Sequence, residues 1–189
     1  AINSEKLAVT SGAMDAPVAS ASAVLKDVEV FTPGQLAKLN GPEVGIGFVT
    51  EKQGVYNAIK GELVLSDAQM YDASAEGALS SILHRKRAVP FVRYLNPNIK
   101  GKDFIKFDGI SIQDDVVKLI DRKFYKSSTR ADPEQLERAF IALDQNCIKV
   151  QKCMEVVYEF PNEGARAAAQ RLIDRESWGL YLTTKVVAF

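Results

Sequence analysis

Lysine and arginine carry the most evident chemistry in this sequence. The first basic group lies between residues 85 and 106 and comprises Arg85, Lys86, Arg87, Arg93, Lys100, Lys102 and Lys106. The second comprises Arg122, Lys123, Lys126 and Arg130. Cationic side chains contact phosphates, and the interleaved Phe91, Tyr94 and Phe104 offer faces on which unpaired bases stack. The pattern predicts an interface for single-stranded nucleic acid, most naturally RNA. The alternative is a solvated segment whose cations pair with carboxylates elsewhere in the chain.

A catalytic site is not expected. The one histidine, His84, lies in the run His84-Arg85-Lys86-Arg87, where neighbouring cations disfavour its protonated form. No serine, cysteine or carboxylate beside it completes a recognisable triad. We therefore predict that the chain is not an enzyme and has no catalytic residue. A small enzyme with dispersed site residues is the alternative.

Metal and cofactor sites are not expected either. The sequence has no histidine pair and no Cys-x-x-Cys motif. Asp114, Asp115 and Asp121 are attributed to the first turn and one face of a predicted helix, where the helix dipole favours aspartate. Cys147 and Cys153 lie six residues apart on another predicted helix. That spacing points them in different directions, so we expect two buried thiols in a reducing compartment.

Composition limits the classes of function. The 24 lysines and arginines balance the 24 aspartates and glutamates, which argues against a dedicated binder of duplex DNA. An apolar content of 47% is enough for a sizeable core. No apolar run approaches membrane-spanning length, and no membrane partner is expected. The N-terminal segment lacks signal-peptide blocks, and the missing initiator methionine indicates a processed mature chain.

Capping patterns and periodicity predict a series of helices. Thr32-Pro33-Gly34-Gln35 and Ser66-Asp67-Ala68-Gln69 have the form of capping boxes. The expected helices cover residues 32–39, 49–61, 66–87, 113–125, 132–161 and a segment starting at Asn162. The strongest of them carries a seven-residue repeat made of Leu136, Phe140, Leu143, Cys147, Val150, Met154 and Val157. We interpret this segment as the central helix of a bundle.

Two segments carry β signals. Residues 104–107 and 110–112 flank Asp108-Gly109, a pair typical of a two-residue hairpin turn. Residues 178–189 are rich in aromatic and β-branched residues and predict a strand or an extended arm.

These elements predict a mainly α-helical fold, with a bundle-like body, one small hairpin and extended arms at both ends. The expected organisation is an N-terminal arm at 1–27, a helical core domain at 28–177 and a C-terminal extended segment at 178–189. Arms of this kind join identical subunits into closed or helical assemblies.

The resulting functional hypothesis is a self-assembling viral coat or nucleocapsid protein that packages single-stranded RNA. Its expected partners are further copies of itself, joined through the terminal arms, and RNA. Its expected location is the virion, after assembly in the host cytoplasm. The alternative is a non-viral structural or interaction module that binds no nucleic acid.

Overall fold

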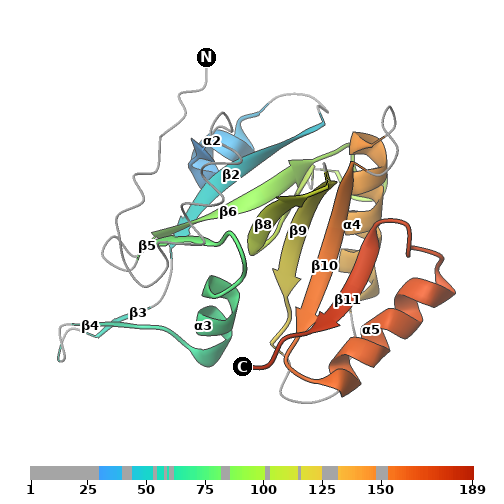
Figure 1. Ribbon diagram of the computed structural model, residues 1–189. Coiled ribbons are helices and arrows are strands. Elements are labelled where there is room, and N and C mark those ends of the chain that lie inside the picture. The colour runs from blue at the N-terminus through green and yellow to red at the C-terminus, as the bar shows by residue number, and fades with distance from the viewer. Residues whose placement is uncertain are drawn as a thin grey trace.

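The structure is a computed structural model that describes residues 30–39, 44–52, 55–57, 59, 62–81, 86–100, 103–114, 116–124, 132–147 and 153–189. Helices separate runs of strands in this part of the chain, and the strands assemble into two main sheets and a separate ribbon (Figure 1). The fold is α/β, so the prediction of a mainly helical bundle was wrong. The predicted arm at 1–27 lies outside the described residues.

The first sheet is built around a long central strand, β6. Its strands are β1 (Val30–Phe31), β2 (Gly45–Lys52), β5 (Leu79–Ser81), β6 (Lys86–Arg93) and β7 (Phe104–Lys106). The order is β1–β2–β6–β5, and β7 pairs with the second half of β6. Only the β1–β2 pairing is parallel among these strands. This sheet positions Glu51 opposite Arg87 in the β2–β6 register.

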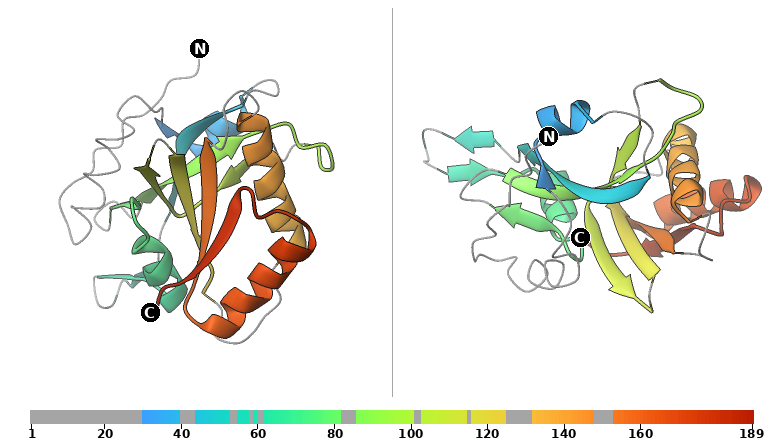
Figure 2. Two further views of the ribbon diagram at one scale, coloured as in Figure 1. Left: turned by 45° about the vertical axis from the view of Figure 1, so that its right-hand side comes forward. Right: turned by 90° about the horizontal axis from the view of Figure 1, so that it is seen from above.

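The second sheet has the order β11–β10–β9–β8. Its elements are β8 (Gly109–Gln113), β9 (Val116–Arg122), α4 (Pro133–Asn146), β10 (Met154–Phe160), α5 (Glu163–Arg175) and β11 (Leu182–Val186). Strands β9, β10 and β11 are parallel, and α4 and α5 make the crossovers between them (Figure 2). Both helices pack their buried faces on the same side of the sheet, in one continuous apolar core.

The predicted helix starts are confirmed where a local capping motif marks them. Helix α2 (Pro33–Ala37) and helix α3 (Asp67–Ala73) both begin with complete capping boxes, at Thr32 and Ser66. Asp132 caps α4 and Asn162 caps α5, through side-chain oxygens that accept backbone N–H bonds.

Several predicted helices are strands or end early. Helix α3 ends at Ala73 and is followed by β5, so the predicted helix over 66–87 was wrong. The predicted helix over 113–125 is β9, preceded by a turn in which Asp114 has a positive φ of 52°. The predicted helix over 132–161 stops at Asn146, and its last part is strand β10. In β10 the buried residues alternate, because every second side chain faces the helices.

Both strands of the hairpin predicted about Asp108-Gly109 are present, but they do not pair with each other. Strand β7 pairs with β6 of the first sheet, and β8 pairs with β9 of the second. Asp108 and Gly109 therefore lie where the chain passes from one sheet to the other. The C-terminal segment is a strand as expected, and it pairs with β10 of its own chain.

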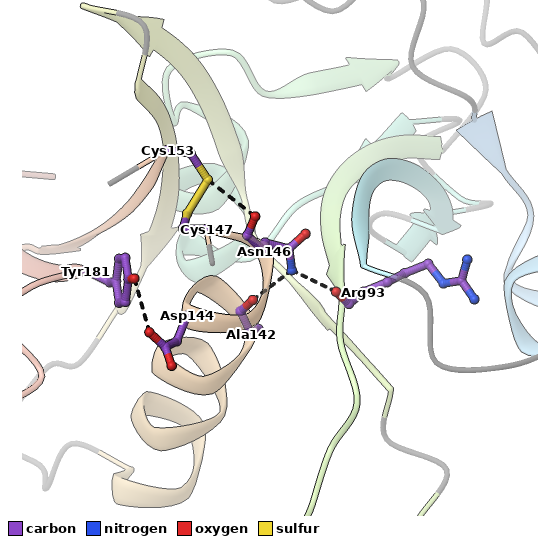
Figure 3. Close-up of a disulfide and its surroundings, with 7 residues drawn as sticks. All are labelled: Arg93, Ala142, Asp144, Asn146, Cys147, Cys153 and Tyr181. Atoms are coloured by element: carbon purple, nitrogen blue, oxygen red, sulfur yellow. Dashed lines mark hydrogen bonds between the residues drawn. A yellow bond between two sulfur atoms is a disulfide. The ribbon is translucent and has the colours of Figure 1, made fainter. Parts of the chain in front are cut away.

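A disulfide joins Cys147, at the end of α4, to Cys153, just before β10 (Figure 3). The prediction of two free thiols was wrong, because the helix ends at Asn146 and the chain reverses before Cys153. The Sγ atom of Cys153 lies 3.7 Å from the carbonyl oxygen of Asn146.

Helix α4 also contacts the first sheet and the segment that follows β6. Arg138 donates from Nε to the Tyr94 hydroxyl, at 2.9 Å, and from Nη2 to the Phe104 carbonyl, at 2.9 Å. Gln145 exchanges two hydrogen bonds with the backbone of Leu95. Asn146 donates to the carbonyl of Arg93 (Figure 3). These bonds hold the end of β6 against the helix layer of the second sheet.

The remaining strands, β3 (Val55–Asn57) and β4 (Glu62–Val64), form an antiparallel two-stranded ribbon. The ribbon follows β2 and leads into α3, and it projects away from both sheets (Figures 1 and 2). Ile59, in the turn between its strands, is 98% exposed. Helix α3 and the C-terminus lie on the same side of the molecule as the ribbon (Figure 1).

Candidate functional site

The described basic residues fall into two groups by environment. Arg87, Arg122 and Lys123 lie near one another and pair with carboxylates of the same chain. Arg93 is half-buried at the far end of β6, and Lys100 is exposed in the segment that follows it. The side chains of Arg85, Lys86, Lys102, Lys126 and Arg130 lie outside the described residues, as does His84.

Arg87 and its partners connect the first sheet to the start of the second. Its Nε lies 2.8 Å from Glu51 Oε1, and its Nη2 lies 3.1 Å from Asp108 Oδ1. Lys106 reaches the other oxygen of Glu51 at 3.0 Å. Burial works to raise the pKa of Glu51, but Arg87 and Lys106 outweigh it and hold that pKa below its usual range. Asp108 in turn accepts the backbone N–H of Arg122 at 2.8 Å.

Arg122 is the most completely engaged of the cations. Its Nε lies 2.9 Å from Glu159 Oε1, and both side chains are less than a tenth exposed. Its Nη1 donates to the Tyr71 carbonyl at 2.9 Å and to the Ser74 hydroxyl. Its guanidinium carbon lies 4.7 Å from the centre of the Tyr71 ring. Arg122 therefore joins the ends of β9 and β10 to helix α3.

Two carboxyl groups in this region have pKa values above the usual range of aspartate. Burial raises the pKa of Asp121 to about 7, Lys123 opposes that effect at 3.0 Å, and the nearby Asp108 adds to it. Asp121 Oδ2 is buried and has no hydrogen-bond partner among the described residues. On α3, burial also raises the pKa of Asp72 to about 7, with a further contribution from Asp108.

We refer to these side chains together as the charged cluster. It comprises Glu51, Asp72, Arg87, Lys106, Asp108, Asp121, Arg122, Lys123 and Glu159. The cluster lies where the parallel strands β9 and β10 end, which is the edge of an α/β sheet at which ligand sites commonly occur. Its cations pair with carboxylates of the same chain. These ion pairs hold strands and helices together, and they leave the cations less available to bind an anionic ligand.

A polar hollow of about 500 Å³ lies beside the cluster, on the face of the second sheet opposite α4 and α5. Its lining consists of Glu76, Ser111, Ile112, Gln113, Lys118, Ile120, Glu155, Val157, Glu159, Thr183, Thr184 and Lys185. The central strands β9 and β10 supply alternate residues to this lining, as the period of a strand requires, and the outer strands β8 and β11 supply consecutive ones. The lining has no aromatic side chain, so the hollow offers no face on which a base could stack.

The described part of the chain contains neither a metal-binding group nor a membrane-spanning helix. No three histidine, cysteine or carboxylate side chains there are grouped closely enough to hold a metal ion. No helix in that part is both long and apolar enough to cross a bilayer.

The basic groups of the sequence contain four members of the cluster, Arg87, Lys106, Arg122 and Lys123, but their partners were missed. Asp121 was attributed to a predicted helix and Asp108 to a hairpin turn, and Glu51, Asp72 and Glu159 were not identified as site residues. The strand register brings these carboxylates together from segments far apart in the chain. Comparison with protein-family models, curated proteins and solved structures gives no match.

Proposed function

We propose that this chain is a self-assembling structural subunit, and that its β3–β4 ribbon docks on a second copy of the chain. The observation that carries the proposal is the projecting ribbon with the 98% exposed Ile59 in its turn. A two-stranded ribbon by itself is marginally stable in water, and its edges, which pair with no other described strand, are templates for further strand pairing. A ribbon held away from its own body gains stability when a partner covers it.

Exposed apolar side chains on nearby elements extend this surface. Met70 on α3 is 42% exposed, and Phe189 at the C-terminus is 62% exposed. Phe189 also packs edge-on against Tyr71 and Phe124, so the chain end is fastened to the body on the ribbon side. Apolar groups gathered on one side of a soluble subunit favour a protein interface there.

A viral coat or nucleocapsid that packages single-stranded RNA is the narrower form of this proposal. Lys100 is exposed and supports it. Arg87, Arg122 and Lys123 do not support it, because each pairs with a carboxylate of its own chain. Assembly and RNA binding are therefore separate parts of the proposal. If the chain assembles but binds no RNA, it is a subunit of a non-viral assembly without nucleic acid. The contribution of an arm at 1–27 also stays a prediction.

The test compares the full chain with a variant whose residues 55–64 are replaced by a short glycine-serine linker. We expect large particles from the full chain, seen by light scattering on a sizing column and by electron microscopy, and monomers from the variant. Leu180→Ser, at a 57% exposed position before β11, is the matched control and should assemble normally. A full chain that is monomeric at high concentration, or a variant that assembles as well, contradicts the proposal. Ultraviolet absorbance of the particles decides whether they contain nucleic acid.

A further inference from the structure

We propose that the charged cluster is a proton-operated clamp on the base of the β3–β4 ribbon. When the cluster takes up protons near neutral pH, it fixes the ribbon in the orientation that assembly needs. This inference rests on the proposed function, since it assigns a means of regulation to the same ribbon.

Both ends of the ribbon connect directly to the cluster. On the incoming side, β2 ends at Lys52, and the preceding Glu51 is held by Arg87 and Lys106. On the outgoing side, β4 ends at Val64 and α3 begins at Asp67. Helix α3 is then fixed by Arg122, which bonds to the Tyr71 carbonyl and the Ser74 hydroxyl. The cluster therefore holds the strand before the ribbon and the helix after it.

The charges of the cluster do not balance when every group is ionised. Each packed element contributes to it: Glu51 from β2, Asp72 from α3, Arg87 from β6, Lys106 from β7, Asp108 from the connection to β8, Asp121, Arg122 and Lys123 from β9, and Glu159 from β10. Carboxylates thus outnumber cations by one. Tyr71 stays neutral, because burial raises its pKa to about 12. Lys106 and Glu51 keep contact with solvent, but Asp121 is buried, and a buried charge in excess of its partners is costly, so the cluster favours taking up a proton.

Asp121 is the natural place for that proton. One of its oxygens contacts Lys123, and the other is buried with no partner among the described residues. Asp108 lies close to the same carboxyl group, and two ionised carboxylates at close range repel each other. Loss of the proton sets Asp121 against Asp108, the same group that holds Arg87 at 3.1 Å. Arg87 in turn holds Glu51 at the base of the ribbon. The raised pKa values of Asp72 and Asp121, both about 7, agree with titration near neutrality.

The experiment measures assembly of the full chain by light scattering from about pH 5.5 to about pH 8.5, beside Asp121→Asn and the control Asp174→Asn. Asparagine copies the shape of the protonated carboxyl group and cannot ionise. Asp174 is exposed on α5 and far from the cluster in the chain. We expect the assembly constant of the full chain and of the control to fall about tenfold as pH rises through neutrality. The Asp121→Asn variant should change much less and assemble well at both ends of the range.

A second measurement reads the clamp without relying on assembly. Hydrogen exchange of peptides covering residues 51–73, corrected for the intrinsic effect of pH, should quicken above neutrality in the full chain and not in Asp121→Asn. If Asp121→Asn loses its native circular dichroism, Asp72→Asn serves in its place, with the same expectation.

The two proposals fail in different ways. A chain that assembles through the ribbon, but whose pH profile and exchange are unaffected by Asp121→Asn, overturns the clamp and leaves the proposed function standing. A chain that is monomeric at every pH overturns the proposed function, and the exchange measurement then decides the clamp alone.

Discussion

The guanidinium of Arg122 and the carboxylate of Glu159 lie 2.9 Å apart at positions directly opposite each other in the β9–β10 register. Both strands run in the same direction, and β9 ends at Arg122 while β10 ends one residue after Glu159. The pair is therefore buried at the edge of the sheet where these two strands end. Arg122 also donates from Nη1 to the Tyr71 carbonyl and the Ser74 hydroxyl. Its side chain therefore joins β9, β10 and α3.

Neutralising one member of this pair should be costly. We expect Glu159→Gln to lower the free energy of unfolding by about 3–5 kcal/mol, because it leaves the Arg122 charge buried without its counter-ion. Urea unfolding measures the change. Glu137→Gln, at an exposed position on α4, is the control and should stay within about 0.5 kcal/mol of the parent. A loss below about 1 kcal/mol for Glu159→Gln would show that water reaches the pair.

Stability should depend on pH through Asp72 and Asp121. Their pKa values are raised to about 7 in the folded chain from the ordinary aspartate value of 3.8, so the folded state binds protons that the unfolded state releases. The free energy of unfolding should therefore rise as pH falls from about 7 towards about 4. Glu51 acts in the opposite sense, because its lowered pKa favours folding above about pH 4.5 and that benefit is lost in acid.

Urea unfolding at a series of pH values tests this dependence. Asp121→Asn should flatten the profile between pH 4 and pH 7, while Asp174→Asn leaves it as in the parent. An equally steep profile for Asp121→Asn would assign the proton uptake to other groups.

Reduction of the disulfide should weaken the fold moderately. Cys147 and Cys153 close a loop with a sequence separation of 6, and loop-closure entropy for that length corresponds to about 2 kcal/mol. Unfolding with and without a reducing agent measures the difference. The Cys147→Ser, Cys153→Ser double variant should match the reduced parent and should not respond to the reducing agent.

Assembly in a host cytoplasm stays a prediction. Thiol titration of freshly purified protein tests it, because disulfides persist in oxidising compartments.

Gly77 should tolerate no side chain. Its φ is +71°, and an added Cβ would overlap the carbonyl group of Ile110. The turn after α3 approaches β8 closely here, and the Ile110 N–H donates to the Glu76 carbonyl at 3.0 Å. We expect Gly77→Ala to cost at least about 1–3 kcal/mol. The control is Gly179→Ala, since a Cβ at Gly179 meets nothing within 4 Å. Equal melting temperatures for the two variants would contradict the close approach.

Local sequence motifs predicted the starts of the helices correctly, but the pairing of strands from distant parts of the chain could not be predicted. The caps at Thr32, Ser66, Asp132 and Asn162 each depend on residues within one helical turn, so they could be predicted directly. The seven-residue repeat continued past Asn146 only by coincidence of spacing. Beyond that point Met154, Val156 and Tyr158 are buried in the two-residue period of a strand.

The same limit applies to the charged cluster. A run of cations such as Arg122-Lys123 has the same sequence whether it faces solvent or carboxylates. Only the register of β9 with β10 places Glu159 beside Arg122, and only the passage between the sheets places Asp108 near Asp121. Strand register depends on the whole fold, and short segments of sequence do not specify it.

The hydrogen bonds from α4 to the end of β6 have a consequence for how the molecule melts. Arg138, Gln145 and Asn146 attach the helix layer of one sheet to the backbone of the other. Neither half can then separate while the other keeps its hydrogen bonds. The described body should therefore unfold in a single cooperative transition, with equal calorimetric and van't Hoff enthalpies, and without a stage in which one sheet survives alone.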